Sequence, residues 1–516
     1  MIGGDSILSI QIIAEARKEN VFLQPRHFFE HQTIAELALV AESGSNILAE
    51  QGILSGEVQL TPIQHYFFEQ NFKNVHHWNQ SVLLRVNKPL DKVILEQAFT
   101  KLIEHHDCLR LRFSKKSDIW SQQMAEKEEN TVLEWIEVEK SEPVDQLAIF
   151  NNAQESLNLI EGPVIKAVFI NNSSDLQLFI TIHHLAVDGV SWRILVEDLQ
   201  EIYLALSNKD EVKLAPKTTS YRQYAAELQK YASKYELIRE LEYWKEQQNL
   251  RIGAIPVAFV GTENTEASVR KIIVNLDEAL TKSLLSEANS AYTTRINDLL
   301  LAAMAKTLSK LTGQCNNQIL LESHGREDLF ENIDLTRTVG WFTSIYPVTL
   351  TSTDDNIDRL IKTVKETLHN VPYNGFNYGI LKYLSGTKSK NVLSELLKPQ
   401  LSFNYLGQLD IQENDNDLFS LKNEDLGSLH GPDNCRNHQI DVNAYVIDNK
   451  IHFDFEYSEN LNRTETIREF ANDYIESLQQ IINYCANTST NNYTPSDFAD
   501  VDLDQDELDS ILSELS

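Results

Sequence analysis

The sequence LFITIHHLAVDGVSWRILVEDLQEIYLAL, residues 178–206, combines three local signals that predict a strand, a loop and a helix in succession. Its first five residues are apolar, β-branched or aromatic, which is typical of a buried strand. The run ends at His183 and His184, and Asp188 with Gly189 then forms an Asp-Gly pair that favours a turn or a helix start. We therefore expect the two histidines at a strand end, where a rigid scaffold can present an imidazole to a cavity.

The residues after this loop predict an amphipathic helix, because apolar side chains recur at positions 195, 199, 202 and 206. An imidazole titrates near neutral pH, so His184 can take or give a proton without a large pKa shift. Asp188 either orients this imidazole or serves the fold. The other histidine pairs, at 76/77 and 105/106, lack the Asp-Gly turn, and we interpret them as structural.

The segment HHLAVDG, residues 183–189, resembles the HHxxxDG signature of the condensation and epimerization domains of nonribosomal peptide synthetases, and the VSWRIL that follows is closer to the epimerization type. Further segments resemble the epimerization motifs in the expected order, so the resemblance spans essentially the whole chain. They are PIQHYFF (62–68), the segment from Asn297 to Leu311, ESHGRE (322–327), RTVGWF (337–342), PYNGFNYGIL (372–381) and FNYLGQ (403–408).

This resemblance implies an α/β fold of two chloramphenicol-acetyltransferase-like lobes, arranged as a V around a central tunnel and preceded by a partial helical carrier bundle. It also implies epimerization of the Cα of an aminoacyl or peptidyl thioester bound to a phosphopantetheinyl carrier. Inversion needs one group on each side of the Cα, one to remove a proton and one to deliver a proton. The resemblance assigns these roles to His184 and to Glu322, the first residue of ESHGRE. Ser323 stands where the family usually has glycine.

Other motif residues are expected to support these two. Asn404, Tyr405 and backbone amides near His184 are candidate donors to the enolate oxygen, and packing at a strand end is the equal alternative for Asn404 and Tyr405. We expect His183, Asp188 and Gly189 to hold the loop rather than to transfer protons. Arg337 should find a partner if it is buried. Asp188, Arg326 and Glu327 are candidate members of that network.

The N-terminal GGDSI, residues 3–7, has the form of a helix N-cap but resembles the attachment motif of peptidyl carrier proteins. The resemblance implies that Ser6 carries 4′-phosphopantetheine and that most of the first half of the carrier precedes Met1. The expected organisation is a partial carrier at 1–45, a linker at 46–57, a first lobe at 58–235, a second lobe at 236–490 and an acidic segment at 491–516.

The acidic segment contains apolar residues at 508, 511, 512 and 515 and resembles the donor docking segments that follow epimerization domains. It predicts a downstream synthetase condensation domain as a partner, beside upstream adenylation and carrier modules. A disordered solubilising tail is the alternative. Two other functions also stay open: a condensation domain that forms a peptide bond between carrier-bound substrates, and an inactive scaffold that only docks a carrier.

Composition excludes several classes of function. The net charge of −31 over 516 residues argues against nucleic acid as a partner. The sequence has no signal-peptide pattern and no long apolar run, which predicts a cytoplasmic protein without a membrane partner. Its four cysteines are far apart, so we expect buried apolar fillers and neither a metal site nor disulfides.

Two further regions carry structural expectations. Residues 221–244 predict a long charged helical region that connects the halves of the chain. Residues 372–381 have the glycine-aromatic character of a mobile loop.

Overall fold

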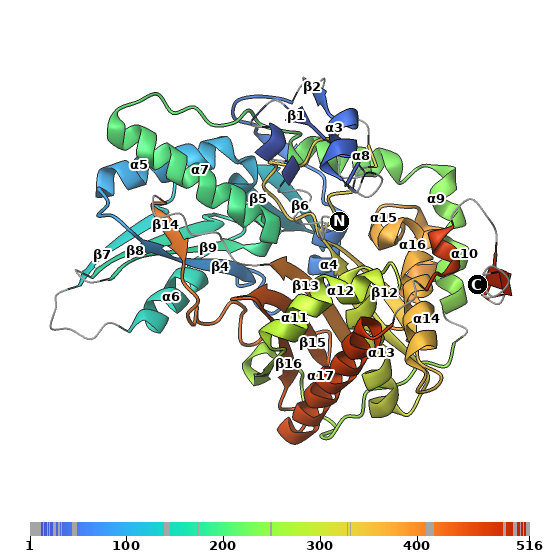
Figure 1. The fold of residues 1–516 in the computed structure, drawn as a ribbon. Coiled ribbons are helices and arrows are strands. Elements are labelled where there is room, and N and C mark those ends of the chain that lie inside the picture. Colours follow the sequence, from blue (N-terminus) through green and yellow to red (C-terminus); the bar gives the residue numbers. More distant parts are fainter. Residues whose placement is uncertain are drawn as a thin grey trace.

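Figure 1 shows the computed structural model of the chain. It describes residues 12–511 except positions 14, 18, 20, 24–26, 29, 30, 32, 44–48, 139–144, 173, 174, 248, 249, 328, 331, 409–416, 489–491, 499–502, 506 and 509. The predicted attachment residue Ser6 therefore lies outside the described residues. Two β-sheets with helices packed on them confirm the predicted α/β class and its two lobes.

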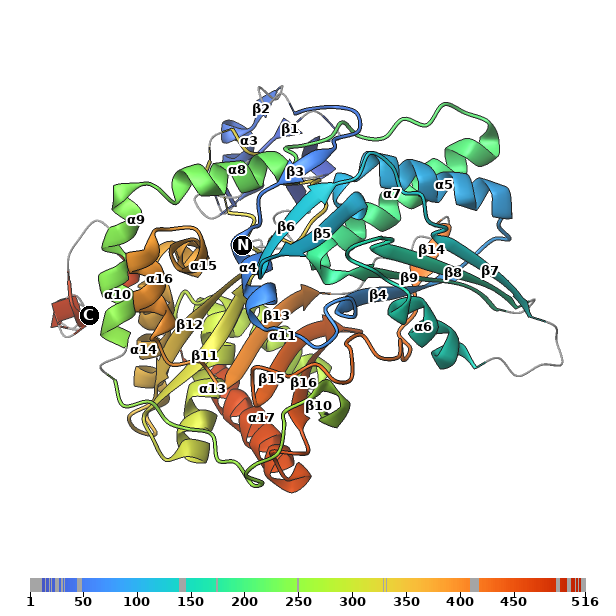
Figure 2. The ribbon, with the colours of Figure 1, turned by 180° about the vertical axis from the view of Figure 1, so that it is seen from behind.

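The first lobe is built on a five-stranded sheet of order β14-β4-β9-β8-β7. Helices α5 (Lys92–His105) and α7 (Gly189–Asn208) cover one face of this sheet, and α6 (Gln146–Glu155) covers the other (Figure 2). Its strands from this half of the chain are β4 (Asn79–Val86), β7 (Leu133–Val138), β8 (Ile165–Asn172) and β9 (Asp175–His183). A second, three-stranded sheet contains β3 (Gly56–Val58), β5 (Leu111–Lys116) and β6 (Ile119–Met124), and α4 (Pro62–Glu69) follows β3.

The second lobe is built on a six-stranded sheet of order β10-β16-β15-β13-β11-β12. Its strands are β10 (Val269–Asn275), β11 (Asn316–Ser323), β12 (Ser344–Thr351), β13 (Leu401–Gln408), β15 (Ile440–Ile447) and β16 (Lys450–Ser458). The helices of this lobe include α11 (Glu278–Leu285), α12 (Glu287–Ser290), α13 (Ile296–Thr312), α14 (Ile357–His369) and α17 (Thr464–Ala486). Helix α13 begins after Arg295, and Asp298 accepts a hydrogen bond from the Arg295 N–H.

The six-stranded sheet has one apolar and one polar face, because successive side chains of a strand point to opposite sides. The apolar face packs on α17, where the Phe455 ring meets Phe470. Strand register places Phe455 beside Val442, and Val442 beside Phe403. The opposite face carries polar side chains at neighbouring positions of four strands, namely Glu322, Ser402, Asn404, Asp441, Asn443, Asp454 and Glu456.

A strand from the second half of the chain completes the sheet of the first lobe. Strand β14 (Phe419–Leu421) pairs antiparallel with β4 and forms one edge of this sheet (Figure 1). Just before β4, the Trp78 ring stacks on His430 with centroids 3.8 Å apart. The chain therefore crosses back between lobes inside the range 236–490 that was predicted as the second lobe alone.

Two predicted regions differ from the structure in form. The segment 221–244 is three helices, α8 (Tyr221–Tyr231), α9 (Tyr235–Arg239) and α10 (Leu241–Glu246), rather than one long helix. The prediction of a mobile loop at 372–381 is wrong, because a 3-10 turn leads into the buried helix α15 (Phe376–Tyr383). Gly375, at φ +77°, lets the turn approach the Tyr346 ring, and apolar residues of α15 then pack on the core.

The described residues near the N-terminus form a small apolar cluster, and those near the C-terminus contact the rest of the chain. Helix α3 (Ile34–Val40) shares a small apolar cluster with Ile13 and Leu23. Near the C-terminus, Asp497 forms an ion pair with the buried Lys365 of α14 at 2.7 Å, and Leu508 is buried. Part of the predicted docking segment therefore belongs to the packed structure.

The cysteine prediction is correct for two residues only. Cys108 and Cys485 are buried, whereas Cys315 and Cys435 are exposed, and all four thiols are free. Among the described residues, no helix is both long and apolar enough to cross a membrane.

Candidate active site

The loop between β9 and α7 has the strand, turn and helix order that the sequence predicts. Residues 184–186 form a short 3-10 turn, and Asp188 is the N-cap of α7. Its carboxylate accepts hydrogen bonds from the Ser191 backbone N–H at 2.8 Å and from the Ser191 hydroxyl at 2.7 Å. These bonds satisfy donors at the helix start that would otherwise have no partner. Gly189 has open space around its Cβ direction, so sterics alone do not demand glycine there.

The two histidines of this loop are held in opposite tautomers. The Leu185 N–H donates to His183 Nδ1 at 3.2 Å, so His183 Nε2 must carry the proton that it donates to the Val75 carbonyl at 2.9 Å. His184 Nδ1 lies 2.9 Å from the Val187 carbonyl, which can only accept, so Nδ1 is protonated and Nε2 is the basic nitrogen. Backbone groups occupy both nitrogens of His183, whereas Nε2 of His184 is bound by a side chain.

The remaining ring nitrogen of His184 faces side chains. His184 Nε2 lies 2.9 Å from the Gln80 amide nitrogen, and the Trp341 ring packs on the imidazole with centroids 4.3 Å apart. Burial lowers the pKa of His184 to about 4, so the ring is neutral at pH 7 and able to accept a proton. Trp341 comes from the second lobe, in the segment RTVGWF, and no local pattern predicts its contact with His184.

A buried ion pair joins the loop of the first lobe to the second lobe. Arg326 donates to both carboxylate oxygens of Asp188, at 3.0 and 3.1 Å, and its guanidinium also binds the carbonyls of Leu335 and Thr338. His184 precedes Asp188 by four residues, and Glu322 precedes Arg326 by four residues. The Asp188–Arg326 ion pair therefore links the chain segment that carries His184 to the segment that carries Glu322.

Glu322 is the second-last residue of β11 and lies on the polar face of the six-stranded sheet. The Asn404 side-chain amide donates to Glu322 Oε2 at 2.9 Å from the neighbouring strand. Burial, with a smaller effect from the negative charge of Asp441, raises the pKa of Glu322 to about 7. No ion pair of Glu322 with a cation is found in the described part of the chain, whereas Asp188 and Asp441 pair with arginines.

The carboxylate of Asp441 is held by three polar groups on the same sheet face. Arg436 forms an ion pair with it, His438 Nδ1 lies 2.9 Å from Oδ1, and the Ser402 hydroxyl donates to it. These partners depress the pKa of Asp441 although burial acts in the other direction. Asp441 is thus a fixed negative charge near Glu322.

Two other predicted residues are placed differently from expectation. Arg337 binds Asp198 and Glu197 of α7, not the Asp188 network, so there are two separate ion-pair groups. Tyr405 follows Asn404 on β13, and adjacent strand residues point to opposite faces, so its ring is not on the Glu322 face. Ser323 pairs regularly with Ser344 in the strand, and serine fits there without strain.

Gly325 is the glycine of this motif that the backbone requires. Its φ is +64°, and a Cβ would lie 1.8 Å from the Phe342 carbonyl oxygen. The resulting close approach brings Arg326 against Phe342, with the guanidinium 4.1 Å from the ring centroid.

The other histidine pairs are in structural contacts, as predicted. His77 Nε2 lies 2.7 Å from the Ser428 carbonyl, and His106 Nε2 lies 2.8 Å from Asp198. His105, His106 and Asp198 could together ligate a metal ion. Both oxygens of Asp198 already have partners, because Arg337 binds one and His106 the other.

A cavity of about 20 Å³, enough for about one water molecule, lies behind Trp341. Its walls include Ile63 and Thr61 at the start of α4, Tyr224 of α8 and Ile380 of α15. Trp341 both lines this cavity and packs on the imidazole of His184.

Known proteins resemble this chain both in sequence family and in structure. The family model "Condensation domain" matches residues 54–503, and the model "Phosphopantetheine attachment site" matches residues 1–40. The crystal structure of the epimerization domain from the third module of tyrocidine synthetase B is 34% identical, with a TM-score of 0.80, and the match covers 85% of this chain and 99% of that chain.

Several curated synthetases are also similar. A linear gramicidin synthase polypeptide from Brevibacillus parabrevis is 41% identical over 99% of this chain and 7% of its own length. Gramicidin S synthase 1 from Brevibacillus brevis is 36% identical over 100% of this chain and 48% of its own length. The chain therefore spans less than half the length of these relatives. The first condensation domain of the calcium-dependent antibiotic synthetase, at 15% identity and a TM-score of 0.64 over 84% of this chain and 98% of that chain, shares the fold.

Proposed function

Because this chain belongs to the condensation-domain family of nonribosomal peptide synthetases, and because it carries a carboxylate base candidate in addition to the histidine loop, we propose that it epimerizes the Cα of a carrier-bound thioester. The proposed substrate is an aminoacyl or peptidyl thioester on a phosphopantetheinyl carrier. The proposed enzyme class is an isomerase that uses two bases. His184 and Glu322 are the proposed catalytic residues.

One observation carries this proposal. Glu322 is a half-buried carboxylate bound by the neutral amide of Asn404, and its pKa is raised to about 7. Such a carboxylate lowers folding stability unless a cation compensates its charge, so its presence favours a chemical role. A condensation reaction needs the histidine loop but offers no comparable role for this acid.

The mechanism follows from the resting proton positions. His184 Nε2 is unprotonated and accepts the Cα proton from one side, and the electron pair of the C–H bond moves onto the thioester carbonyl. Protonated Glu322 then delivers its proton to the other side of the same carbon, which completes inversion. The reverse direction uses Glu322 as the base and protonated His184 as the acid.

The charge that develops on the thioester oxygen needs hydrogen-bond donors. Asn404 is the favoured candidate of the two predicted side chains, because it shares the Glu322 face whereas Tyr405 does not. His183, Asp188, Arg326 and Arg337 are proposed to hold the loops, as their backbone and ion-pair contacts support.

The wider arrangement is proposed from the same family relation. Ser6 lies in the matched attachment segment and is the proposed site of 4′-phosphopantetheine, with upstream adenylation and carrier modules supplying the thioester. A downstream condensation domain is the proposed acceptor, reached through the C-terminal acidic segment. The predicted boundaries 1–45, 46–57, 58–235, 236–490 and 491–516 stay proposals, with β14 assigned to the first sheet.

Mass spectrometry in deuterated water tests the proposal directly. The full chain is incubated with a carrier loaded with an aminoacyl thioester, and the released amino acid is analysed for deuterium and for configuration. The expected result is one deuterium at Cα together with inversion. Peptide-bond formation with a second loaded carrier and no deuterium would instead identify a condensation domain. No change with either substrate would identify a docking scaffold.

A further inference from the structure

Gln80 lies beside His184 because their strands are neighbours. Gln80 is on β4 opposite Ile182 of β9, next to the pair formed by Asn79 and His183. Its side chain is half-buried, and its two polar atoms have different partners. The amide nitrogen lies 2.9 Å from His184 Nε2, and the amide oxygen lies 3.0 Å from Trp192 Nε1 on α7.

The side chains of Trp192, Gln80 and His184 form a row of hydrogen bonds, and the chemistry of each group determines the direction of each bond. The indole N–H of Trp192 can only donate, so it fixes the Gln80 oxygen as its acceptor. The Gln80 amide nitrogen therefore donates to His184 Nε2, which must be an unprotonated acceptor. At the other end of the ring, Nδ1 donates to the Val187 carbonyl, which can only accept. Trp192, Gln80 and His184 thus donate in one direction along the row.

We propose that Gln80 is a positioning residue that holds His184 in the tautomer with a proton on Nδ1 and a basic Nε2. This inference rests on the proposed function of His184 as a base. A donor aimed at the neutral nitrogen stabilises the neutral imidazole and opposes its protonation. Gln80 therefore keeps the resting base free of a proton and makes the protonated ring return its proton readily.

The comparison with His183 supports a role beyond local structure. His183 is fixed in its tautomer by main-chain atoms at both nitrogens, which cannot leave without unfolding the loop. His184 Nε2 is bound by a side chain, which can move aside when the Cα–H bond of a substrate approaches. When that bond breaks and the Nε2–H bond forms, the Gln80 N–H loses its acceptor and is available to another oxygen.

Other groups also act on the ionisation of His184. Asp188 on its own loop favours the protonated ring, whereas His430 from the segment along β4 and the adjacent His183 oppose it. Trp341 packs on the ring without an ionisable group. None of these groups bonds His184 Nε2, so variants of Gln80 change the state of that nitrogen selectively.

Histidine NMR on the full chain tests the assignment without relying on turnover. Long-range proton–nitrogen correlation of ¹⁵N-histidine-labelled protein reports which ring nitrogen is protonated, and the His184 signal is identified by its loss in His184→Ala. We expect wild-type His184 at pH 7 to carry its proton on Nδ1 only. Gln80→Glu keeps the side-chain size but places an acceptor at Nε2, so both nitrogens should be protonated at pH 7.

Two more variants should shift the His184 titration by smaller amounts. Gln80→Ala should raise the midpoint of the His184 titration less than Gln80→Glu does, and Trp192→Phe should give a smaller rise because the amide can then rotate. Gln123→Ala, at an exposed glutamine of β6, should leave the titration unchanged. In turnover, Gln80→Glu should lower kcat for Cα exchange about 100-fold, the size expected for a misplaced catalytic group, with KM nearly unchanged.

The outcomes separate the two levels of inference. Unchanged tautomer and titration of His184 in both Gln80→Glu and Gln80→Ala, with a native circular dichroism spectrum, would overturn the role of Gln80. If these NMR changes occur but wild-type protein exchanges no Cα proton, the positioning role stands and the proposed epimerization fails.

Discussion

The two proposed bases are prepared in opposite ways. His184 sits on a loop, its ring is bonded at both nitrogens, and burial lowers its pKa to about 4. Glu322 sits on a sheet with one amide partner, and burial raises its pKa to about 7. The same physical cause therefore makes the histidine a neutral acceptor and keeps the carboxyl group partly protonated near pH 7. A two-base inversion requires one unprotonated and one protonated group, so the pair of bases must hold one proton in total.

The largest expected effect is the loss of inversion when either base is replaced. Glu322→Gln keeps side-chain size but not basicity, so inversion should fall by at least about 100-fold in both directions, the lower range for general acid–base catalysis. Deuterium should still enter without inversion from the one enantiomer whose proton faces His184. His184→Gln should show the reverse preference. Configuration-resolved mass spectrometry measures both.

Glu327→Gln is the matched control, because Glu327 lies in the same motif but outside the proposed chemistry. It should invert both enantiomers at close to the wild-type rate. Equal deuterium entry from both enantiomers in Glu322→Gln would contradict the assignment of Glu322 as the second base.

The next effect concerns the ion pair that ties the two regions together. Asp188→Ala leaves Arg326 buried without its partner, which should lower the free energy of unfolding by about 3 to 5 kcal/mol. Asp188→Asn keeps part of the hydrogen bonding and should lose less. Urea denaturation measures both.

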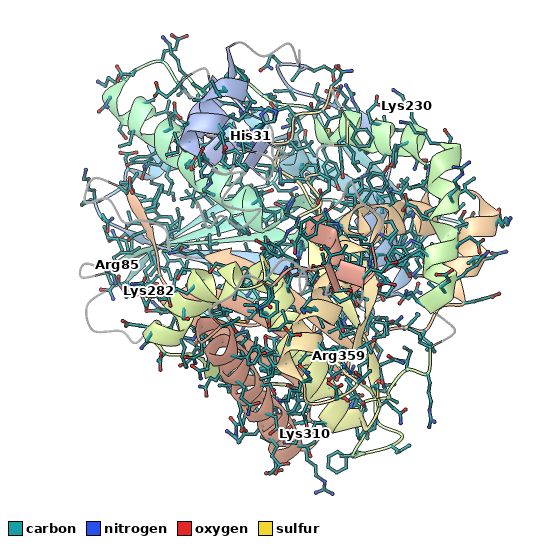
Figure 3. The ribbon with its side chains drawn as sticks, turned by 45° about the vertical axis from the view of Figure 1, so that its right-hand side comes forward. His31, Arg85, Lys230, Lys282, Lys310 and Arg359 are labelled. Carbon is teal, nitrogen blue, oxygen red and sulfur yellow. The ribbon has the colours of Figure 1, made fainter. Side chains whose placement is uncertain are left out.

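An exposed ion pair provides the control for this comparison. Lys310, at the edge of the second lobe in Figure 3, pairs with Asp473 at 2.7 Å. Lys310→Ala should change the free energy of unfolding by less than about 1 kcal/mol. An Asp188→Ala variant that is as stable as wild type but inactive would show that Asp188 takes part in the chemistry.

The two bases should also change the pH dependence of stability with opposite signs, over overlapping ranges below neutral pH. The folded-state pKa of Glu322, about 7, lies above its ordinary value of 4.5, so the folded state binds the proton more tightly and stability is lost as pH rises from 4.5 through 7. Glu322→Gln should therefore stabilise the protein by about 1 to 3 kcal/mol at pH 8 relative to pH 4.5.

For His184 the sign is reversed. Its folded-state pKa of about 4 lies below 6.5, so stability is lost as pH falls from 6.5 through 4. His184→Gln should remove this part of the acid sensitivity. Chemical denaturation at pH 4.5, 6.5 and 8 measures both variants, and parallel stability curves for wild type and Glu322→Gln would contradict the buried-carboxylate account.

The smallest effect is a shift in the pH dependence of turnover. The form with one shared proton should give a bell-shaped profile of kcat/KM with limbs near the two pKa values, about 4 and about 7. Asp441→Asn removes the negative charge that helps to raise the pKa of Glu322. The alkaline limb should move to lower pH by less than about one unit, because burial is the larger cause.

Asp454→Asn is the control for this shift, because Asp454 lies further along the same sheet face and binds Lys271. It should leave the alkaline limb in place. A shift in the acidic limb with Asp441→Asn would mean that Asp441 acts on the histidine side instead.

Local sequence patterns predicted the strand, loop and helix around His184, because alternation and capping are local properties. The residues that orient the imidazole were not predictable, since Gln80 reaches His184 only through the pairing of β4 with β9. Arg337 was expected near Asp188, yet it binds α7, and no local pattern distinguishes these acidic partners. The buried helix α15 was mistaken for a loop because its glycines indicate flexibility until the core that it contacts is known.

Strand β14 comes from the second half of the chain but pairs with β4 in the sheet of the first lobe. This pairing has a consequence for protein engineering. A chimera that joins halves of two homologues at residue 235 would take β14 from one parent and its partner β4 from the other. The Trp78–His430 stack would then be formed by residues from different parents. Recombination that exchanges residues 417–436 together with the first half preserves both contacts.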